Sequence, residues 1–279
     1  YSEDPEFKKG SAGNSTVAGV ASDASGSESS AFGYNSLATG RESLAAGYKN
    51  TANGESSSSV GWQNSADGGY ASSVGYGNKA SEYGSSAFGR GNTASGGYSS
   101  TFGDRNTASG WESSAFGFIN TASGSESSAF GYKNTASGRY SSAFGHGNTA
   151  SGGYSSAFGR SYKVSGNYSG AFGVGVANWN NTTNQYDYSY INEGNNSYMI
   201  GNYNKIASGS DNNFILGNNV SIGAGVQNSV VLGNSSASGG SNTVSVGSSS
   251  NKRKIVNVAN GTDDSDAATL GQVKNLIAS

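Results

Sequence analysis

The feature that most constrains this sequence is a 14-residue repeat, which runs without insertion through more than half of the chain. Such a unit is too short for a repeat built from two helices, but it accommodates two strands of about five residues joined by short turns. We therefore predict an all-β, left-handed parallel β-roll, a solenoid whose turns stack about 4.8 Å apart. A glycine marks each repeat: Gly19, Gly33, Gly47, Gly61, Gly75, Gly89, Gly103, Gly117, Gly131, Gly145, Gly159 and Gly173.

The segment "NTASG" in each repeat alternates between two faces of a strand. Its Asn, Ala and Gly fall on one face, and its Thr and Ser fall on the other. We expect the first face to line the interior and the second to face water. The core residues predicted from this segment are Ala94, Ala108, Ala122 and Ala136.

The segment "SSAFG" is apolar or small on both faces, which is typical of a strand buried on both sides. Where Ala46 replaces the usual Phe, Leu44 restores the lost volume on the same face. We expect the Phe column to fill the roll and the small column to permit close approach of a second copy, although the reverse assignment also fits the pattern. The predicted core Phe residues are Phe88, Phe102, Phe116, Phe130, Phe144 and Phe158.

Composition excludes several classes of function. The net charge of −2 argues against a nucleic-acid partner, and the absence of Cys excludes disulfides and thiolate metal sites. No apolar run reaches the roughly 20 residues of a membrane span. The first residues contain no apolar signal segment, so we interpret the chain as a mature part of a longer protein.

The pattern divides the chain into an N-terminal segment (1–14), a head of 14-residue repeats (15–173), an irregular insertion (174–200), further repeats (201–250), a neck (251–275) and the start of a coiled-coil stalk (266–279). In the later repeats the marker glycines are Gly201, Gly217, Gly233 and Gly247. The spacing between them is 16 residues for the first two intervals and 14 residues, as in the head, for the last. The acidic run from Asp263 to Asp266 is predicted to cap the final helix, and Leu270, Val273 and Ile277 have coiled-coil spacing.

Two stretches carry a family resemblance. "NSVVLGN" (228–234) and its divergent form "SSAFGYKNTASG" resemble the head repeats of YadA-like trimeric autotransporter adhesins. "RKIVNVANGTDDSDAATLGQVKN" (253–275) is similar to the neck of that family. The neck residues that carry the similarity are Arg253, Ile255, Asn257, Val258, Gly261, Asp266, Leu270 and Val273.

The resemblance implies a homotrimer exposed on the surface of a Gram-negative bacterium. It implies attachment to host proteins such as collagen, fibronectin, laminin or receptors of the carcinoembryonic-antigen-related (CEACAM) type. It also implies that only a C-terminal anchor, outside this chain, contacts the outer membrane. No cofactor is expected.

Two groups of residues are candidates for receptor binding. The column after the marker glycine combines aromatic residues with Arg, as protein-binding hot spots do, or its rings stack on one another as structural shielding. The insertion is either a binding loop or a lid on a neighbouring chain. The candidates are Tyr34, Tyr48, Trp62, Tyr76, Arg90, Phe118, Tyr132, Arg160, Trp179, Tyr186, Tyr188 and Tyr190.

An enzyme is not expected, because a repeating ladder builds no converging acid–base pair and His146 is the only His. The acidic run lacks the Ca²⁺-loop pattern, so no metal site is predicted. Two alternatives to adhesion remain open. The outward Thr column would suit an ice-binding solenoid, and the whole roll would suit a passive spacer.

Overall fold

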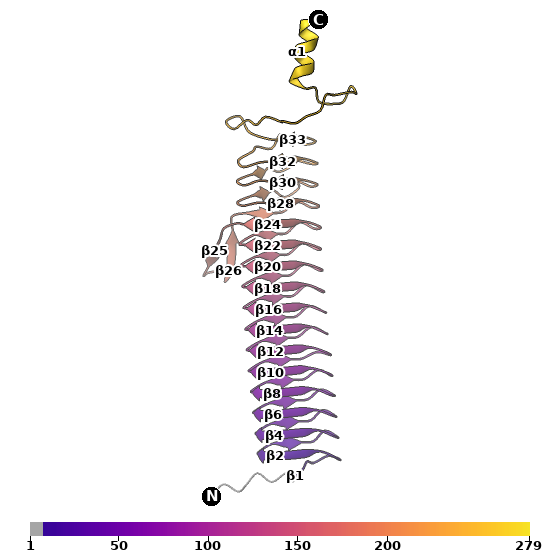
Figure 1. Ribbon diagram of the computed structural model, residues 1–279. Helices are drawn as coiled ribbons and strands as arrows, with labels where there is room; N and C mark the ends of the chain where they lie inside the picture. The colour runs from indigo at the N-terminus through magenta and orange to yellow at the C-terminus, as the bar shows by residue number, and fades with distance from the viewer. Residues whose placement is uncertain (1–7) are drawn as a thin grey trace.

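The computed structural model describes residues 8–279 and has the form of a slender β-solenoid of about 16 turns with one helix at its C-terminal end (Figure 1). Each turn adds one strand to a parallel sheet that we call the long-strand sheet, and every turn before the last two also adds one to a second parallel sheet, the short-strand sheet. Equivalent residues of neighbouring turns pair in register, as Phe88 pairs with Phe102 and Ala94 with Ala108. The predicted parallel solenoid is therefore confirmed.

The long-strand sheet contains β2 (Thr16–Val20), β4 (Ser30–Tyr34), β6 (Leu44–Tyr48), β8 (Ser58–Trp62), β10 (Ser72–Tyr76), β12 (Ser86–Arg90), β14 (Ser100–Asp104), β16 (Ser114–Phe118), β18 (Ser128–Tyr132), β20 (Ser142–His146), β22 (Ser156–Arg160), β24 (Gly170–Val174), β28 (Tyr198–Ile200), β30 (Phe214–Leu216), β32 (Val230–Leu232) and β33 (Val244–Ser245). At its N-terminal edge β1 (Lys8–Lys9) pairs antiparallel with β2.

The short-strand sheet contains β3 (Asp23–Ala24), β5 (Leu37–Ala38), β7 (Thr51–Ala52), β9 (Ser65–Ala66), β11 (Lys79–Ala80), β13 (Thr93–Ala94), β15 (Thr107–Ala108), β17 (Thr121–Ala122), β19 (Thr135–Ala136), β21 (Thr149–Ala150), β23 (Lys163–Val164), β27 (Ile191–Asn192), β29 (Lys205–Ile206) and β31 (Ser221–Ile222). These strands have two residues rather than the expected five. A hairpin of β25 (Ala177–Asn180) and β26 (Gln185–Tyr188) and a helix α1 (Leu270–Ala278) complete the chain.

The Phe column lies on the outside of the roll, which corrects the expectation that it fills the interior. Ala87 and its equivalents are fully buried, whereas the side chain of Phe102 is 64% exposed. A 14-residue turn is too tight to enclose a ring, so only small side chains fit between the sheets. The predicted inward Ala94, Ala108, Ala122 and Ala136 are fully buried. The Phe residues that prove not to be interior are Phe88, Phe102, Phe116, Phe130, Phe144 and Phe158.

The marker glycines are required by two local constraints. Gly103 has φ of +116°, a conformation that side chains disfavour. A Cβ at this position would lie 2.1 Å from the carbonyl oxygen of Gly117 in the next turn. The strict glycine column therefore follows from the close stacking of backbones.

A buried amide ladder runs along the interior beside the glycines. Asn106 is representative: its Nδ2 donates to Oδ1 of Asn92 at 3.0 Å, to the Phe102 carbonyl at 3.1 Å and to the Gly117 carbonyl at 2.7 Å. Its Oδ1 accepts from the backbone N–H of Asn120 at 3.0 Å. Each Asn thereby joins three turns, and its buried amide group is fully hydrogen-bonded.

The longer turns that follow the insertion have a wider interior. In this part of the solenoid the buried positions hold larger apolar side chains than in the 14-residue turns: Met199, Ile206, Ile215, Val220, Ile222 and Val231. Tyr162 stands where the Asn ladder meets the insertion. Its hydroxyl donates to the Gly201 carbonyl at 2.8 Å and accepts from the backbone N–H of Asn204 at 3.1 Å. Tyr162 thus bridges the turn from which the hairpin departs.

The neck closes the C-terminal end of the roll. The guanidinium of Arg253 donates to the carbonyls of Asn234 and Val246 at 2.7 and 2.8 Å. Helix α1 begins after an N-cap at Thr269, which forms a capping box with Gln272. The expected cap in the acidic run is therefore wrong: Asp266 instead accepts from the backbone N–H groups of Thr262 and Asp263, which precede it in the chain.

Candidate functional site

The outer face of the long-strand sheet is an exposed apolar surface. Because side chains alternate along a strand, the first, third and fifth residues of each long strand point outward. The third position forms what we call the Phe stripe, in which Phe130 and Phe144 stack with ring centroids 4.9 Å apart. Phe144 and Phe158 continue the stack at 4.8 Å. Phe102 is 64% exposed and Phe172 is 36% exposed, whereas the other Phe residues of the stripe are partly buried.

The fifth position forms the edge ladder, which contains most of the predicted receptor-binding residues. The rings of Tyr34 and Tyr48 stack at 5.2 Å, those of Tyr48 and Trp62 lie 4.6 Å apart, and those of Trp62 and Tyr76 lie 6.0 Å apart. Stacking therefore occurs, as the structural interpretation predicted. The rings nevertheless remain half exposed, at 47% for Trp62 and 51% for Tyr76. The edge ladder is consequently stacked and open to a partner.

Charged residues divide the edge ladder into two sections. Arg90 forms an ion pair with Asp104, the residue that follows it in the column. Beyond this pair the rings resume, with Phe118 and Tyr132 at 5.4 Å and Tyr132 and His146 at 4.8 Å. The column ends with the exposed Arg160.

His146 is a stacked member of the edge ladder. Its partial burial, followed by the positive charges of Arg160 and Lys133, lowers the pKa of its imidazole below the usual value. The ring is therefore neutral near pH 7, which suits stacking on Tyr132.

A second aromatic column, which we call the corner ladder, holds Tyr in some repeats and Glu in others; the sequence pattern favours a solvated turn edge there, and the contacts between its rings were not predicted. It lies at the turn before each long strand, where Tyr83 contacts Tyr70 and Tyr98 at 5.3 and 5.5 Å. From one repeat to the next, the aromatic residue occupies one or the other of two adjacent positions in the turn. Gly69 leaves room for the ring of Tyr83, and Gly84 leaves room for the ring of Tyr98. This exchange of Gly with Tyr was the signal that could have revealed it. Its members are Tyr70, Tyr83, Tyr98, Trp111, Tyr140, Tyr154 and Tyr168.

The insertion folds back over its own chain. The β25–β26 hairpin lies beside the turns that contain β20 to β24 (Figure 1). The Tyr188 hydroxyl is 2.9 Å from the Gly147 carbonyl and 2.8 Å from the Thr149 hydroxyl, and burial raises the pKa of Tyr188 to about 12. The hairpin is thus anchored to the outer face of the short-strand sheet rather than free.

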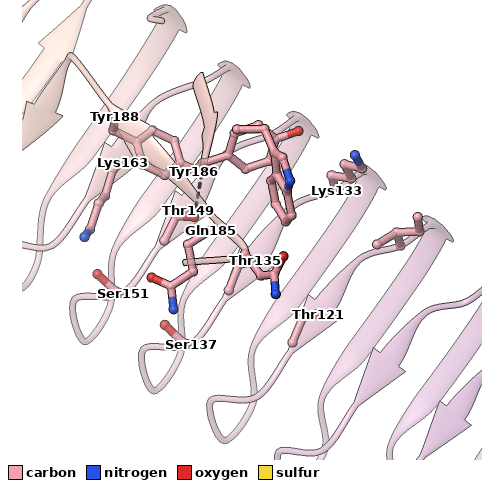
Figure 2. A pocket seen from close by; sticks show the side chains of 13 residues that line it. Thr121, Lys133, Thr135, Ser137, Thr149, Ser151, Lys163, Gln185, Tyr186 and Tyr188 are labelled. Atoms are coloured by element: carbon pink, nitrogen blue, oxygen red, sulfur yellow. Dashed lines mark hydrogen bonds between the residues drawn. The ribbon is translucent and has the colours of Figure 1, made fainter. Parts of the chain in front are cut away.

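A cavity of about 480 Å³ lies between the hairpin and this sheet. Figure 2 shows Gln185, Tyr186 and Tyr188 of the hairpin together with the Thr and Ser side chains of the solenoid. Trp179 and Tyr186 meet edge to face at 5.2 Å. Tyr190 does not belong to this group, because it packs on Tyr203 instead, at 5.4 Å.

The repeats match a known family. The model of the YadA head domain repeat matches residues 38–64, 66–92, 108–134 and 136–161. No curated protein matches the chain. One similar solved structure is the collagen-binding domain of the Yersinia adhesin YadA, which is 20% identical over 78% of this chain and 87% of its own, with a TM-score of 0.30. That score is too low for the likeness to carry an argument.

Stacked 14-residue turns with exposed aromatic ladders define a β-solenoid with an extended outer surface. The matched repeats are YadA head repeats, and this part of the chain therefore resembles the head of a YadA-like adhesin. Such a head lies at the cell surface. Within residues 8–279 no helix is long and apolar enough to cross a bilayer.

Proposed function

We propose that three copies of this chain form the exposed head of a Gram-negative outer-membrane adhesin, which attaches the cell to a host protein through the edge ladder. The observation that carries attachment is the half-exposed column from Tyr34 to Tyr76. Preorganised Tyr and Trp rings supply contact area at little cost in conformational entropy.

The trimer proposal is supported by the Phe stripe. A contiguous apolar stripe that continues over successive turns is the kind of surface that marks an interaction site. In one repeat Ala46 replaces the usual Phe, and Leu44 replaces the usual Ser and restores the lost volume. Both side chains lie on this outer face and are partly buried in the single chain. Compensation of volume is expected where a face packs against a partner.

The neck supports the same assembly. Ile255 and Val256 are 72% and 66% exposed, and Leu270 and Ile277 of α1 are exposed along one seam. Apolar side chains with coiled-coil spacing are stabilised when they pack against equivalent helices. The neck and helix therefore suit a role in tying three rolls together.

The host partner belongs to the matrix proteins or to receptors of the CEACAM type. Collagen is included in the panel of partners to be tested, together with fibronectin, laminin and monomeric receptor ectodomains. Repetition suits attachment, because a long roll provides reach and three copies provide avidity.

The test is interferometry of the purified head against this immobilised panel. We expect one saturable partner, whose affinity falls about tenfold or more in Trp62→Ala. Trp111→Ala removes an equally exposed ring from the corner ladder and serves as the matched control, with little change expected. Absence of any partner, or an equal loss in both variants, would contradict attachment through the edge ladder.

The ice-binding alternative is not supported by the hairpin. A flat hydroxyl array would have to extend along the whole Thr column, but the hairpin covers Thr149, which bonds to Tyr188. Lys79 and Lys163 also interrupt the column.

A further inference from the structure

The hairpin cavity combines features that bear on a small ligand. It lies on the outer face of the short-strand sheet, away from the Phe stripe, and it borders the edge ladder only where Lys133 contacts Tyr132. Its volume of about 480 Å³ is within the range of small-molecule sites. The hairpin roof is held in place by the Tyr188 hydrogen bonds to Gly147 and Thr149, so the cavity is present without a ligand.

The floor of the cavity is a row of hydroxyl groups. Thr121, Thr135 and Thr149 stack in register on successive turns, about 4.8 Å apart. The side-chain amide of Gln185 adds a donor and an acceptor from the roof (Figure 2). Regularly spaced donors and acceptors suit a ligand that carries several hydroxyl groups.

The charge of the cavity is positive. Lys133 and Lys163 line it, and among the described residues no carboxylate does. The ammonium of Lys133 is held between the rings of Tyr132 and Trp179, 5.4 and 5.3 Å from their centroids. Lys163 occupies the column that holds Thr in the preceding turns, and its ammonium has no hydrogen bond or ion pair within residues 8–279. An unpaired cation beside a pocket favours an anionic ligand.

One wall of the cavity is aromatic. Trp179 and Tyr186 line it, and Trp179 is 47% exposed. An exposed indole face is apolar and rich in electrons, so it packs against the C–H groups on one face of a sugar ring. A ligand that satisfies the wall, the floor and the cation at once is a hydroxylated ring bearing a carboxylate.

We propose that this cavity binds an acidic saccharide, with its ring against Trp179, its hydroxyl groups on the Thr row and its carboxylate on Lys163. The site is separate from the edge ladder and goes beyond the proposed attachment to a host protein. Because the short-strand sheet faces away from the Phe stripe, assembly through that stripe leaves the cavity open.

The experiment is a titration of the purified head with methyl glycosides, followed by saturation-transfer NMR. The probes are the glycosides of N-acetylneuraminic acid and glucuronic acid, with methyl galactoside as the neutral control. We expect saturable binding of an acidic glycoside, and the two acidic probes distinguish a sialic acid from a uronic acid. Lys163→Gln should weaken binding about tenfold or more, because a charge-assisted hydrogen bond is lost.

Matched variants separate this site from the edge ladder. Lys79→Gln removes a cation from the same column but far from the hairpin, so it should leave the affinity unchanged. Trp62→Ala should also leave saccharide binding intact. Trp179→Ala should abolish the transfer of magnetic saturation from the protein to the ring protons of the saccharide. Circular dichroism checks that each variant is folded.

Three results would overturn the proposal. The first is no binding of either acidic glycoside, and the second is equal binding of methyl galactoside. The third is equal competition by a short oligoglutamate peptide, which would make the cavity a site for acidic peptides instead. Failure of host-protein binding with retained saccharide binding would reject the proposed function alone.

Discussion

Single side chains are selected here by the spacing between stacked backbones. Inside the 14-residue turns most buried residues are Ala, Ser, Asn or Gly, and the large exceptions, Tyr162 and Val164, stand next to the insertion. Ala fills the narrow interior, Asn pairs the buried carbonyls, and Gly permits the close approach at positive φ.

The glycine column provides a direct prediction at this scale. Gly103→Ala would place Cβ 2.1 Å from the Gly117 carbonyl oxygen at φ of +116°, so we expect a loss of about 3 kcal/mol or more in unfolding free energy. Gly77 has φ of +63° and no atom within 4 Å of its would-be Cβ. Gly77→Ala should cost about 1 kcal/mol. Urea unfolding followed by circular dichroism measures both, and equal costs would contradict the stacking constraint.

His146 provides a second prediction, concerning pH. Its pKa is lowered in the folded chain by burial and then by Arg160 and Lys133, so the unfolded chain binds the proton more readily. Its contribution to stability is therefore present above the unfolded pKa of about 6.5 and is lost as the pH falls below that value. NMR titration of this single His should give a pKa below 6.5. Lys133→Gln should raise it, whereas Lys49→Gln, in the same column far away, should not.

At the scale of elements, the length of each turn sets the width of the core. The 14-residue turns enclose Ala, whereas the longer turns after the insertion enclose Met199, Ile215 and Val231. The insertion is tolerated between these two regions because Tyr162 spans the interrupted turn and bonds to the carbonyl of Gly201. The hairpin then lies on the outer surface, where it needs no interior space.

The attachment of the hairpin can be tested through Tyr188. Tyr188→Phe removes the hydrogen bonds to Gly147 and Thr149, each worth about 1 kcal/mol. We expect faster amide hydrogen exchange in β25 and β26 with an unchanged melting temperature of the roll. Tyr186→Phe is the control, since the Tyr186 hydroxyl has no hydrogen bond within residues 8–279. Unchanged exchange in Tyr188→Phe would show that other contacts hold the hairpin.

The elements were predictable to different degrees. The strict period and the alternation in "NTASG" were sufficient for the parallel stack and for the buried Ala94 column. The direction of the Phe column was not, because alternation shows that Phe88 and Ala87 are on opposite faces but not which face is inside. The narrow interior places Ala87 inside and Phe88 outside. The width of the interior depends on the length of the strands in the short-strand sheet, which have two residues rather than the expected five.

The candidate site was predictable in part. Stacking along the edge ladder followed from the period, since identical positions of successive turns must lie about 4.8 Å apart. The docking of Tyr188 on Thr149 did not follow, because the irregular insertion contains no periodic signal for its direction. The corner ladder could be predicted only as a solvated turn edge, because Glu interrupts its column and some of its rings shift to the adjacent position, as Tyr83 does relative to Tyr98.

At the scale of the whole molecule, the roll has two outer faces with different chemistry. The long-strand sheet presents Phe rings, and the short-strand sheet presents Thr, Ser and the hairpin. This difference between the two faces suits a chain in which the apolar face packs against other copies and the polar face is exposed to solvent. Length and valency then arise from stacking and assembly rather than from any single site.

Sedimentation equilibrium at micromolar concentrations tests the central claim most directly, because it measures whether the Phe stripe joins copies of the chain. The account predicts a trimer for the native chain and a folded monomer for Phe116→Glu combined with Phe144→Glu. Thr93→Glu combined with Thr107→Glu, on the opposite face, should remain trimeric. A native monomer, or a trimer that persists in the Phe variant, would contradict assembly through this face.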